Sequence, residues 1–229
     1  MYKQVSASLA ALWLSSVAVA AELTPWYQQG QAALQQAIAQ TANTNRAKNI
    51  ILFVGDGMGV STVTAARIYQ GQLQGLAGEQ HRLFFETLPY TALSKTYNSN
   101  QQTADSAGTM SAMMTGVKTK AGFIALNERP QRGDCVAALA NQQTTFLEQA
   151  EQAGMATGVV TTARITHATP AATYAHSPER GWESDFDMPA AARQQGCKDI
   201  AAQLLAFELG DGIDVVLGGG RRNFLPVAK

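Results

Sequence analysis

The sequence predicts an α/β fold in which a mostly parallel, doubly wound sheet is covered by helices. Two observations predict it. Two short apolar runs, residues 50–54 and 215–217, each end in a glycine-rich turn, which is typical of strands buried on both faces. Segments with helical spacing of apolar residues alternate with these runs and with a further strand candidate at 159–164.

The first half of the chain carries one strand and two helices in this prediction. The strand at 50–54 is followed by a Thr- and Ala-rich segment, 60–69, which can be helical although its periodicity is poor. A clearer helix begins near Ser106. Its apolar face consists of Met110, Met113, Met114 and Val117.

The second half continues the alternation. A helix is predicted at 145–154, because Thr145 and Glu148 have the spacing of a capping box and Gly154 is a typical helix end. The strand at 159–164 follows, then one helix at 190–209, and then the strand at 215–217.

The N-terminus predicts a signal peptide at residues 1–20. Lys3 precedes a short apolar stretch, and Ala18-Val19-Ala20 fits the small-x-small cleavage rule. The alternative is a buried N-terminal helix. No other segment is long and apolar enough for a membrane span, so we expect a periplasmic or secreted protein, cleaved near Ala20.

Export affects the interpretation of the two cysteines, Cys135 and Cys197. In an oxidising compartment a disulfide is favoured over two unpaired buried thiols, and a loop of this size stabilises a fold by about 4 kcal/mol in the chain-entropy model. Neither cysteine has the neighbours of a metal site.

Composition excludes some classes of function. The 17 basic and 17 acidic side chains balance, which argues against a polyanion-binding surface, so no nucleic-acid partner is expected. The chain has three histidines, His81, His167 and His176, which limits any site that needs several histidine ligands.

Polar residues follow the predicted strands where ligands gather in such sheets. Asp56, between two glycines after the first strand, could bind a metal or could simply belong to a turn. Ser106, at a helix start, could meet a phosphate, although Asp105 or Ser106 could equally be an ordinary N-cap. The G-x-S-x-G elbow of serine hydrolases is absent, so a nucleophilic Ser106 would need activation by a metal ion.

A third group, His167 to Pro170, follows the strand at 159–164. In an extended segment His167 and Thr169 would share a face and could hold hydrated Mg²⁺, the hydroxyl directly and the imidazole through water. The alternative is a polar turn. Arg180 suits bidentate phosphate contact or is an ordinary surface arginine.

Taken together, the motifs ILFVGDGMG, TADSAGTMSAMMTGVKTKAGFIAL, VVTTARITHATPAATYAH with Arg180, and DVVLGGG resemble the alkaline phosphatases, in order and from about residue 48 to 223. The resemblance implies phosphate-monoester hydrolysis, with two Zn²⁺ and one Mg²⁺ as cofactors. It implies that Asp56 bridges one Zn²⁺ and the Mg²⁺, that Ser106 attacks phosphorus and becomes phosphoserine, and that Thr169 binds Mg²⁺.

The same resemblance assigns supporting roles. It implies that Arg180 clamps the phosphoryl oxygens and that Asp105 orients Arg180. His167 stands where the animal-type enzymes have histidine and the enteric bacterial type has aspartate, so the animal-type motif set is expected. Cys135 and Cys197 match a disulfide of the animal-type enzymes.

The chain departs from the family pattern after Gly220, because the remaining residues, RRNFLPVAK, contain no Asp, Glu or His. In the family most zinc ligands lie beyond this point, and His81 and His176 match no zinc-ligand motif. We therefore expect residues 21–229 to be the N-terminal part of a single domain whose sheet is incomplete at its C-terminal side, and to be inactive alone.

Two alternatives remain open from the sequence. One is a metal-dependent phosphodiesterase or sulfatase of the wider superfamily, although the sulfatase modification motif is absent around Ser106. The other is a non-catalytic exported phosphate-binding protein. The expected partners are small phosphomonoesters and, since the family is usually dimeric, a second copy of the chain.

Overall fold

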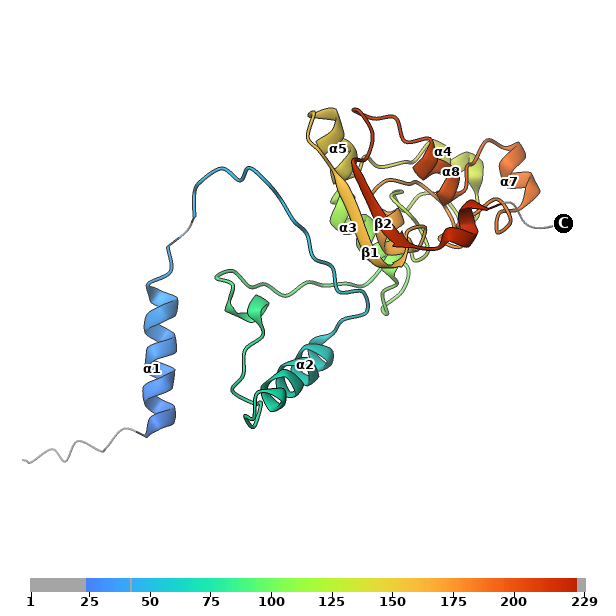
Figure 1. The fold of residues 1–229 in the computed structure, drawn as a ribbon. Coiled ribbons are helices and arrows are strands. Elements are labelled where there is room, and N and C mark those ends of the chain that lie inside the picture. Colours follow the sequence, from blue (N-terminus) through green and yellow to red (C-terminus); the bar gives the residue numbers. More distant parts are fainter. Residues whose placement is uncertain (1–23, 42, 226–229) are drawn as a thin grey trace, which may run out of the picture. The chain divides into compact units, whose positions relative to one another are not determined.

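The structure is a computed structural model that describes residues 24–41 and 43–225 (Figure 1). The predicted signal peptide, residues 1–20, lies outside the described residues. The described chain forms two compact units, one from residues up to 51 together with 84–91, the other from 52–83 together with 92–225. Among the described residues, no helix has the length and the hydrophobicity that crossing a bilayer requires.

The first unit contains the helix α1 (Pro25–Ile38) and the short 3-10 helix η1 (Phe84–Thr87). The α1 helix begins where the Thr24 side chain accepts a hydrogen bond from the Tyr27 N–H, with proline at its first position. The Tyr90 hydroxyl accepts a hydrogen bond from the backbone N–H of Asn43 at 3.1 Å. This bond ties the segment after η1 to the segment after α1.

The second unit contains a two-stranded parallel sheet. The strands are β1 (Gly158–Arg164) and β2 (Val215–Gly219), and Gly158 pairs with Val215 at one end of the ladder. Figure 1 shows the two strands side by side and running in the same direction. The α/β class and the parallel sheet predicted from the sequence are confirmed, as are the predicted strands at 159–164 and 215–217.

Three predicted helices are present with shifted ends. They are α2 (Val60–Leu73), α3 (Ser106–Thr115) and α5 (Phe146–Gln152). The predicted capping box of α5 forms, because the Thr145 and Glu148 side chains each accept from the other's backbone N–H. Helices α4 (Cys135–Leu139) and α6 (Ala168–Ala171) and the 3-10 helix η2 (Arg221–Phe224) were not predicted.

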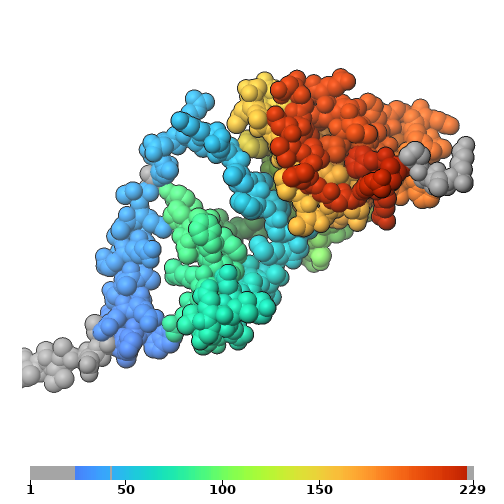
Figure 2. All heavy atoms as spheres, in the orientation of Figure 1, coloured from blue at the N-terminus to red at the C-terminus, as the bar shows by residue number. Residues whose placement is uncertain are grey.

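The main core of the second unit packs α3 against α5 and α6, and α6 against β1. Met110 and Met114 of α3 are buried in it, whereas Met113 is 53% exposed, so the predicted methionine face is narrower than expected. In the space-filling view the part with β1 and β2, yellow to red, packs into one continuous body (Figure 2). This packing holds the start of α3 close to the segment that follows β1.

The single helix predicted at 190–209 is wrong. The structure has two short helices there, α7 (Ala190–Gln194) and α8 (Ile200–Leu205). Gly196 interrupts the helix with a φ of 96°, which glycine adopts readily, and the Asp199 side chain caps α8 by accepting from the Ala202 N–H. The apolar residues keep their helical spacing across this region, but the glycine and the new helix cap divide it into two helices.

The strand predicted at 50–54 is not formed. Its first four residues are 58–91% exposed, and only Val54 packs against the main core. A strand buried on both faces needs partner strands, and within the described residues β1 and β2 pair only with each other. The segment therefore has the sequence pattern of a buried strand, but no strand among the described residues pairs with it.

A disulfide joins Cys135, at the start of α4, to Cys197, between α7 and α8. The two residues are 62 positions apart in sequence, and their Cα atoms are separated by 5.8 Å. They belong to a small buried cluster with Trp182, Met188 and Ala192. The disulfide expected from the sequence is confirmed, and it anchors the segment that contains Trp182.

Replacing both cysteines by serine is expected to lower the free energy of unfolding by about 2–4 kcal/mol, because the unfolded chain loses a long covalent loop. Urea unfolding followed by circular dichroism measures this loss. Adding a strong reductant to the unmodified chain serves as the control and should produce a similar loss. A double variant as stable as the oxidised chain would contradict the prediction.

Candidate active site

Asp56 lies at the centre of a group of polar side chains in the second unit. It follows the 50–54 segment, in a turn where Gly57 has a φ of 67°. Its Oδ1 accepts a hydrogen bond from the Ser106 hydroxyl at 2.9 Å, and its Oδ2 accepts one from the Thr169 hydroxyl at 2.7 Å. One carboxylate thus brings together the predicted nucleophile and the predicted magnesium ligand.

The environment of Asp56 keeps its carboxylate ionised. Partial burial, the largest single influence, raises the pKa, but the hydrogen bonds from Thr169 and Ser106 and the nearby His167 and Arg180 together lower the pKa below its usual value. An ionised carboxylate is an acceptor only, and it is the form that binds metal ions.

Ser106 is the first residue of α3, but it does not cap the helix. The cap is Asp105, whose Oδ1 accepts from the Gly108 N–H at 3.0 Å. The sequence left open whether Ser106 was an ordinary N-cap, and the structure assigns that role to Asp105. The Ser106 hydroxyl is therefore free to face Asp56, at the positive end of the helix dipole.

Asp105 also orients Arg180. Its Oδ2 accepts from Arg180 Nη1 at 3.1 Å and from the Gly122 N–H at 2.9 Å. Burial raises the pKa of Asp105, but the backbone hydrogen bonds from Gly108 and Gly122, with those from Asn98 and Arg180, lower it overall. One ionised carboxylate therefore fixes both the helix start and the guanidinium.

Arg180 contacts His167 on its other side. Arg180 Nη2 lies 3.1 Å from His167 Nε2, and because a guanidinium can only donate, Nε2 is the acceptor. Burial, then the charges of Arg180 and Arg164, hold the pKa of His167 below its usual value. A neutral ring with Nε2 as acceptor carries its proton on Nδ1, which is buried and lacks a hydrogen-bond partner among the described residues.

His167 and Thr169 meet Asp56 differently from the prediction. The sequence placed them on one face of an extended segment, but α6 begins directly after His167 and contains Thr169. His167 Nδ1 lies 4.0 Å from the same Asp56 Oδ2 that Thr169 contacts, which is too long for a hydrogen bond. The two side chains converge through a helical turn instead of strand alternation.

The sequence missed two groups that support this site. Asn98 is buried, and its amide donates to Asp105 Oδ1 at 2.9 Å. Glu183 accepts two hydrogen bonds from Arg164, at 2.8 and 2.6 Å, beside the His167 segment. Neither residue lies in one of the quoted motifs, although the partner of each does, so no local pattern signals its role.

The donor set can be tested against the metals that the sequence resemblance implies. Asp56 and Thr169 offer a carboxylate and a hydroxyl oxygen 2.7 Å apart, which suits Mg²⁺, and the unpartnered Nδ1 of His167 lies beside them. Zinc fits less well. Asp56 and Ser106 could serve one zinc ion, but the described residues contain no cluster of three His, Cys, Asp or Glu side chains able to hold a metal.

The arrangement suits the binding of a phosphoryl group. Arg180 uses two of its five N–H donors on Asp105 and His167, which leaves donors for an anion. The helix start at Ser106 favours negative charge, and Asp56 holds the Ser106 hydroxyl, a potential nucleophile, at this helix start.

Comparisons of the sequence with a family model and with curated relatives point to the same family. A family model described as alkaline phosphatase matches residues 47–229. The tissue-nonspecific alkaline phosphatase of Rattus norvegicus is 52% identical over 202 residues, and that match covers 88% of this chain and 38% of the relative. An alkaline phosphatase of Gadus morhua is 50% identical, with 88% of this chain and 42% of the relative covered.

Solved structures agree. A cold-active alkaline phosphatase from the psychrophile Shewanella sp. superposes with a TM-score of 0.54 at 30% identity, over 75% of this chain and 36% of that one. The alkaline phosphatase of Thermus thermophilus gives 0.54 at 31% identity, over 75% and 30%. The chain thus spans about two fifths of the length of the curated relatives it matches.

Proposed function

The chain belongs to the alkaline phosphatase family, and we propose that it carries the nucleophile and the phosphate-binding residues of a phosphate-monoester hydrolase. The observation that supports this proposal most is that two carboxylates each hold two of the predicted site elements. Asp56 accepts hydrogen bonds from both Ser106 and Thr169, and Asp105 both caps the helix that begins at Ser106 and holds Arg180.

In the proposed reaction, Ser106 Oγ attacks the phosphorus atom. The Oγ–P bond forms as the P–O bond to the alcohol breaks, which leaves a phosphoserine; water then hydrolyses the phosphoserine and regenerates Ser106. Arg180 binds two non-bridging oxygens of the phosphoryl group and orients it for attack. Asp105 and His167 hold the guanidinium in place from its two sides.

The Ser106 hydroxyl donates a hydrogen bond to the Asp56 carboxylate, and this bond holds the hydroxyl in place. Because the pKa of Asp56 lies below its usual value, the carboxylate is a weak base and cannot by itself remove the serine proton at neutral pH. Bound metal ions supply the charge that favours an ionised serine and a leaving alkoxide.

We propose that Asp56 and Thr169 hold Mg²⁺, with His167 beside it, and that Asp56 and Ser106 contribute to one Zn²⁺ site. A catalytic zinc ion usually has three protein ligands, so such a site needs ligands in addition to these. The second Zn²⁺ of the family has no candidate ligand set among the described residues.

The purified chain, supplied with Zn²⁺ and Mg²⁺, is therefore expected to hydrolyse a chromogenic aryl phosphate at a rate near background. A chimera in which this chain replaces the matching part of the rat isozyme, 52% identical, should hydrolyse the ester in a metal-dependent way. An inactive but folded chimera would contradict the proposed function. Fast turnover by the chain alone would contradict the need for further ligands.

A second candidate is phosphate binding without catalysis. It is favoured by the pair of Asp105 and Arg180, which is complete without any metal. Calorimetry with inorganic phosphate distinguishes the two functions. The enzyme predicts that affinity rises when Mg²⁺ and Zn²⁺ are added, whereas a binding protein predicts the same affinity with and without metal.

We also propose that the protein acts after export, in the periplasm or outside the cell. The disulfide between Cys135 and Cys197 supports this, since disulfides persist in oxidising compartments and are rare in the cytosol.

A further inference from the structure

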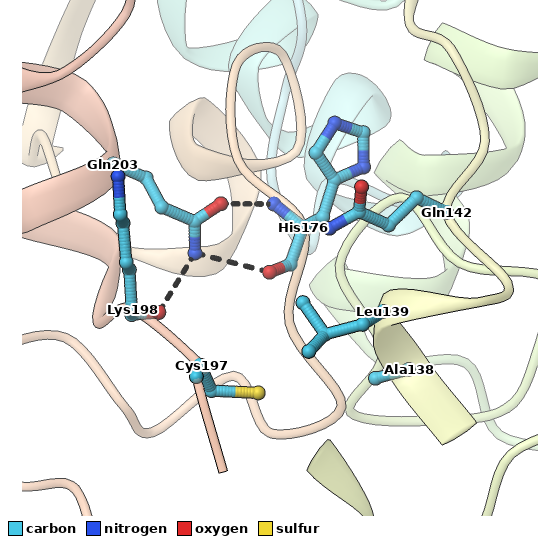
Figure 3. A pocket seen from close by; sticks show the side chains of 8 residues that line it. Ala138, Leu139, Gln142, His176, Cys197, Lys198 and Gln203 are labelled. Carbon is cyan, nitrogen blue, oxygen red and sulfur yellow. Dashed lines mark hydrogen bonds between the residues drawn. The ribbon is translucent and has the colours of Figure 1, made fainter. Parts of the chain in front are cut away.

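A cavity of about 210 Å³ lies beside the disulfide, and its lining includes none of the residues that meet at Asp56. Figure 3 shows the Cys197 sulfur directed into it, between Lys198 and Leu139. The Gln203 amide closes one side, because it donates to the His176 carbonyl at 3.0 Å and to the Lys198 carbonyl at 2.9 Å. These hydrogen bonds hold the Gln203 side chain in place at one side of the cavity. The cavity is open to solvent along exposed residues such as Lys198.

The two sulfurs of the disulfide differ in their access to this cavity. Cys197 lines it and is only partly buried. Cys135 is 0% exposed and packs against Trp182, Met188 and Ala192. A nucleophile from solvent can therefore reach one sulfur of the bond without opening the buried cluster, and that sulfur belongs to Cys197.

We propose that this cavity makes Cys197 a site of thiol–disulfide exchange with low-molecular-weight thiols such as glutathione. The thiolate of the small molecule attacks Cys197 Sγ, a new S–S bond forms there, and the bond to Cys135 breaks. The electron pair of the broken bond leaves on Cys135 as a thiolate, which takes up a proton. No net oxidant is consumed, because one disulfide replaces another.

Two features favour attack at Cys197. Exchange requires contact between the attacking sulfur and the attacked one, and burial denies that contact at Cys135. The cationic side chain of Lys198, which also lines the cavity, attracts the negatively charged carboxylates and thiolate of glutathione.

Opening the bond should loosen the segment next to Arg180. Trp182, two residues after Arg180, packs in the disulfide cluster, and its carbonyl accepts from the Ile200 N–H at 2.9 Å. The exchange would thus loosen the segment that positions the Arg180 guanidinium, although the disulfide does not contact the guanidinium.

The test is to find which sulfur carries the small thiol. The folded, oxidised chain is exposed briefly to glutathione and quenched with an alkylating reagent, and the peptides are read by mass spectrometry. We expect glutathione on Cys197 in at least about tenfold excess over Cys135, with the alkyl group on Cys135. Equal labelling, glutathione mainly on Cys135, or reduction only in denaturant would each overturn the proposal.

A matched pair of variants tests the role of the cavity. Leu139 and Leu205 are both exposed and both end a short helix, but only Leu139 lines the cavity. Leu139→Trp should slow the formation of the mixed disulfide severalfold, whereas Leu205→Trp should leave the rate unchanged. Equal rates in the two variants would show that the cavity is not the route of attack.

Discussion

Ser106→Ala, placed in the chimera with the rat isozyme, is expected to lower aryl phosphate hydrolysis by a factor on the order of 10³ or more. The substitution removes the oxygen that we propose bonds to phosphorus, and among the described residues no second hydroxyl donates to Oδ1 of Asp56. Steady-state kinetics measure the loss. Ser99→Ala is the control, because Ser99 is exposed and outside the site, and it should leave the rate unchanged.

The phosphoserine gives a second readout of the same prediction. After reaction with an aryl phosphate and a quench in acid, mass spectrometry should find phosphate on the peptide that contains Ser106. Thr109 lies one turn further along α3, but its hydroxyl donates to the Asp105 carbonyl at 2.7 Å and points back into the helix. Phosphate on Thr109, or an active chimera that never carries phosphate, would contradict Ser106 as the nucleophile.

The sequence predicted which candidate residues would lie together better than it predicted the structure around them. Asp56, Ser106 and Thr169 each follow or begin an element that a local pattern marks, so their gathering could be expected from the rule that ligands collect at strand ends. The double role of Asp105 could not be derived from the residues alone. The Asp105 carboxylate both caps the helix, through Gly108 close by in sequence, and binds the Arg180 guanidinium. Arg180 is distant in sequence, so no local pattern links it to the cap.

The errors in the fold have a common cause. Periodicity reports which face of a segment is apolar, but it does not report whether partners exist or whether the backbone continues. Gly196 ended a helix that the apolar spacing extended to 209, and residues 50–54 have a strand pattern without a paired strand among the described residues. Where a side-chain bond fixed the element, as in the capping box at Thr145, the prediction was confirmed.

A buried ion pair distant from the site could not have been found from the sequence at all. Glu148 of α5 and His176 are 28 residues apart, and neither belongs to a motif that links them. Glu148 Oε1 lies 2.8 Å from His176 Nε2, and the two side chains are 11% and 12% exposed. The other His176 nitrogen, Nδ1, lies 3.0 Å from the carbonyl of Ala125.

Both ring nitrogens of His176 face acceptors, so the protonated ring is the form that fits. Burial, the largest influence, lowers the pKa of His176, but the hydrogen bond and charge of Glu148 and the Ala125 carbonyl raise it above its ordinary value of 6.5. Burial likewise raises the pKa of Glu148, and His176 with Thr145 holds it below 4.5 overall. The pair is therefore charged at neutral pH.

Glu148→Gln is expected to lower the free energy of unfolding by about 3–5 kcal/mol near pH 6, because it leaves the buried His176 cation without its counter-charge. Urea unfolding measures the change. Glu208→Gln is the matched control, since Glu208 is exposed on the same unit, and it should change stability by less than about 0.5 kcal/mol. A loss no larger than that of the control would show that the pair is not stabilising.

The difference between the unmodified chain and Glu148→Gln should depend on pH in a defined direction. The raised pKa of His176 gives stability that is complete below 6.5 and is lost as the pH rises through the folded value. The lowered pKa of Glu148 gives stability that is present above 4.5 and is lost as the pH falls through its folded value. The difference should therefore be largest between these limits and shrink at alkaline pH, and a difference that grows with alkaline pH would contradict a charged His176.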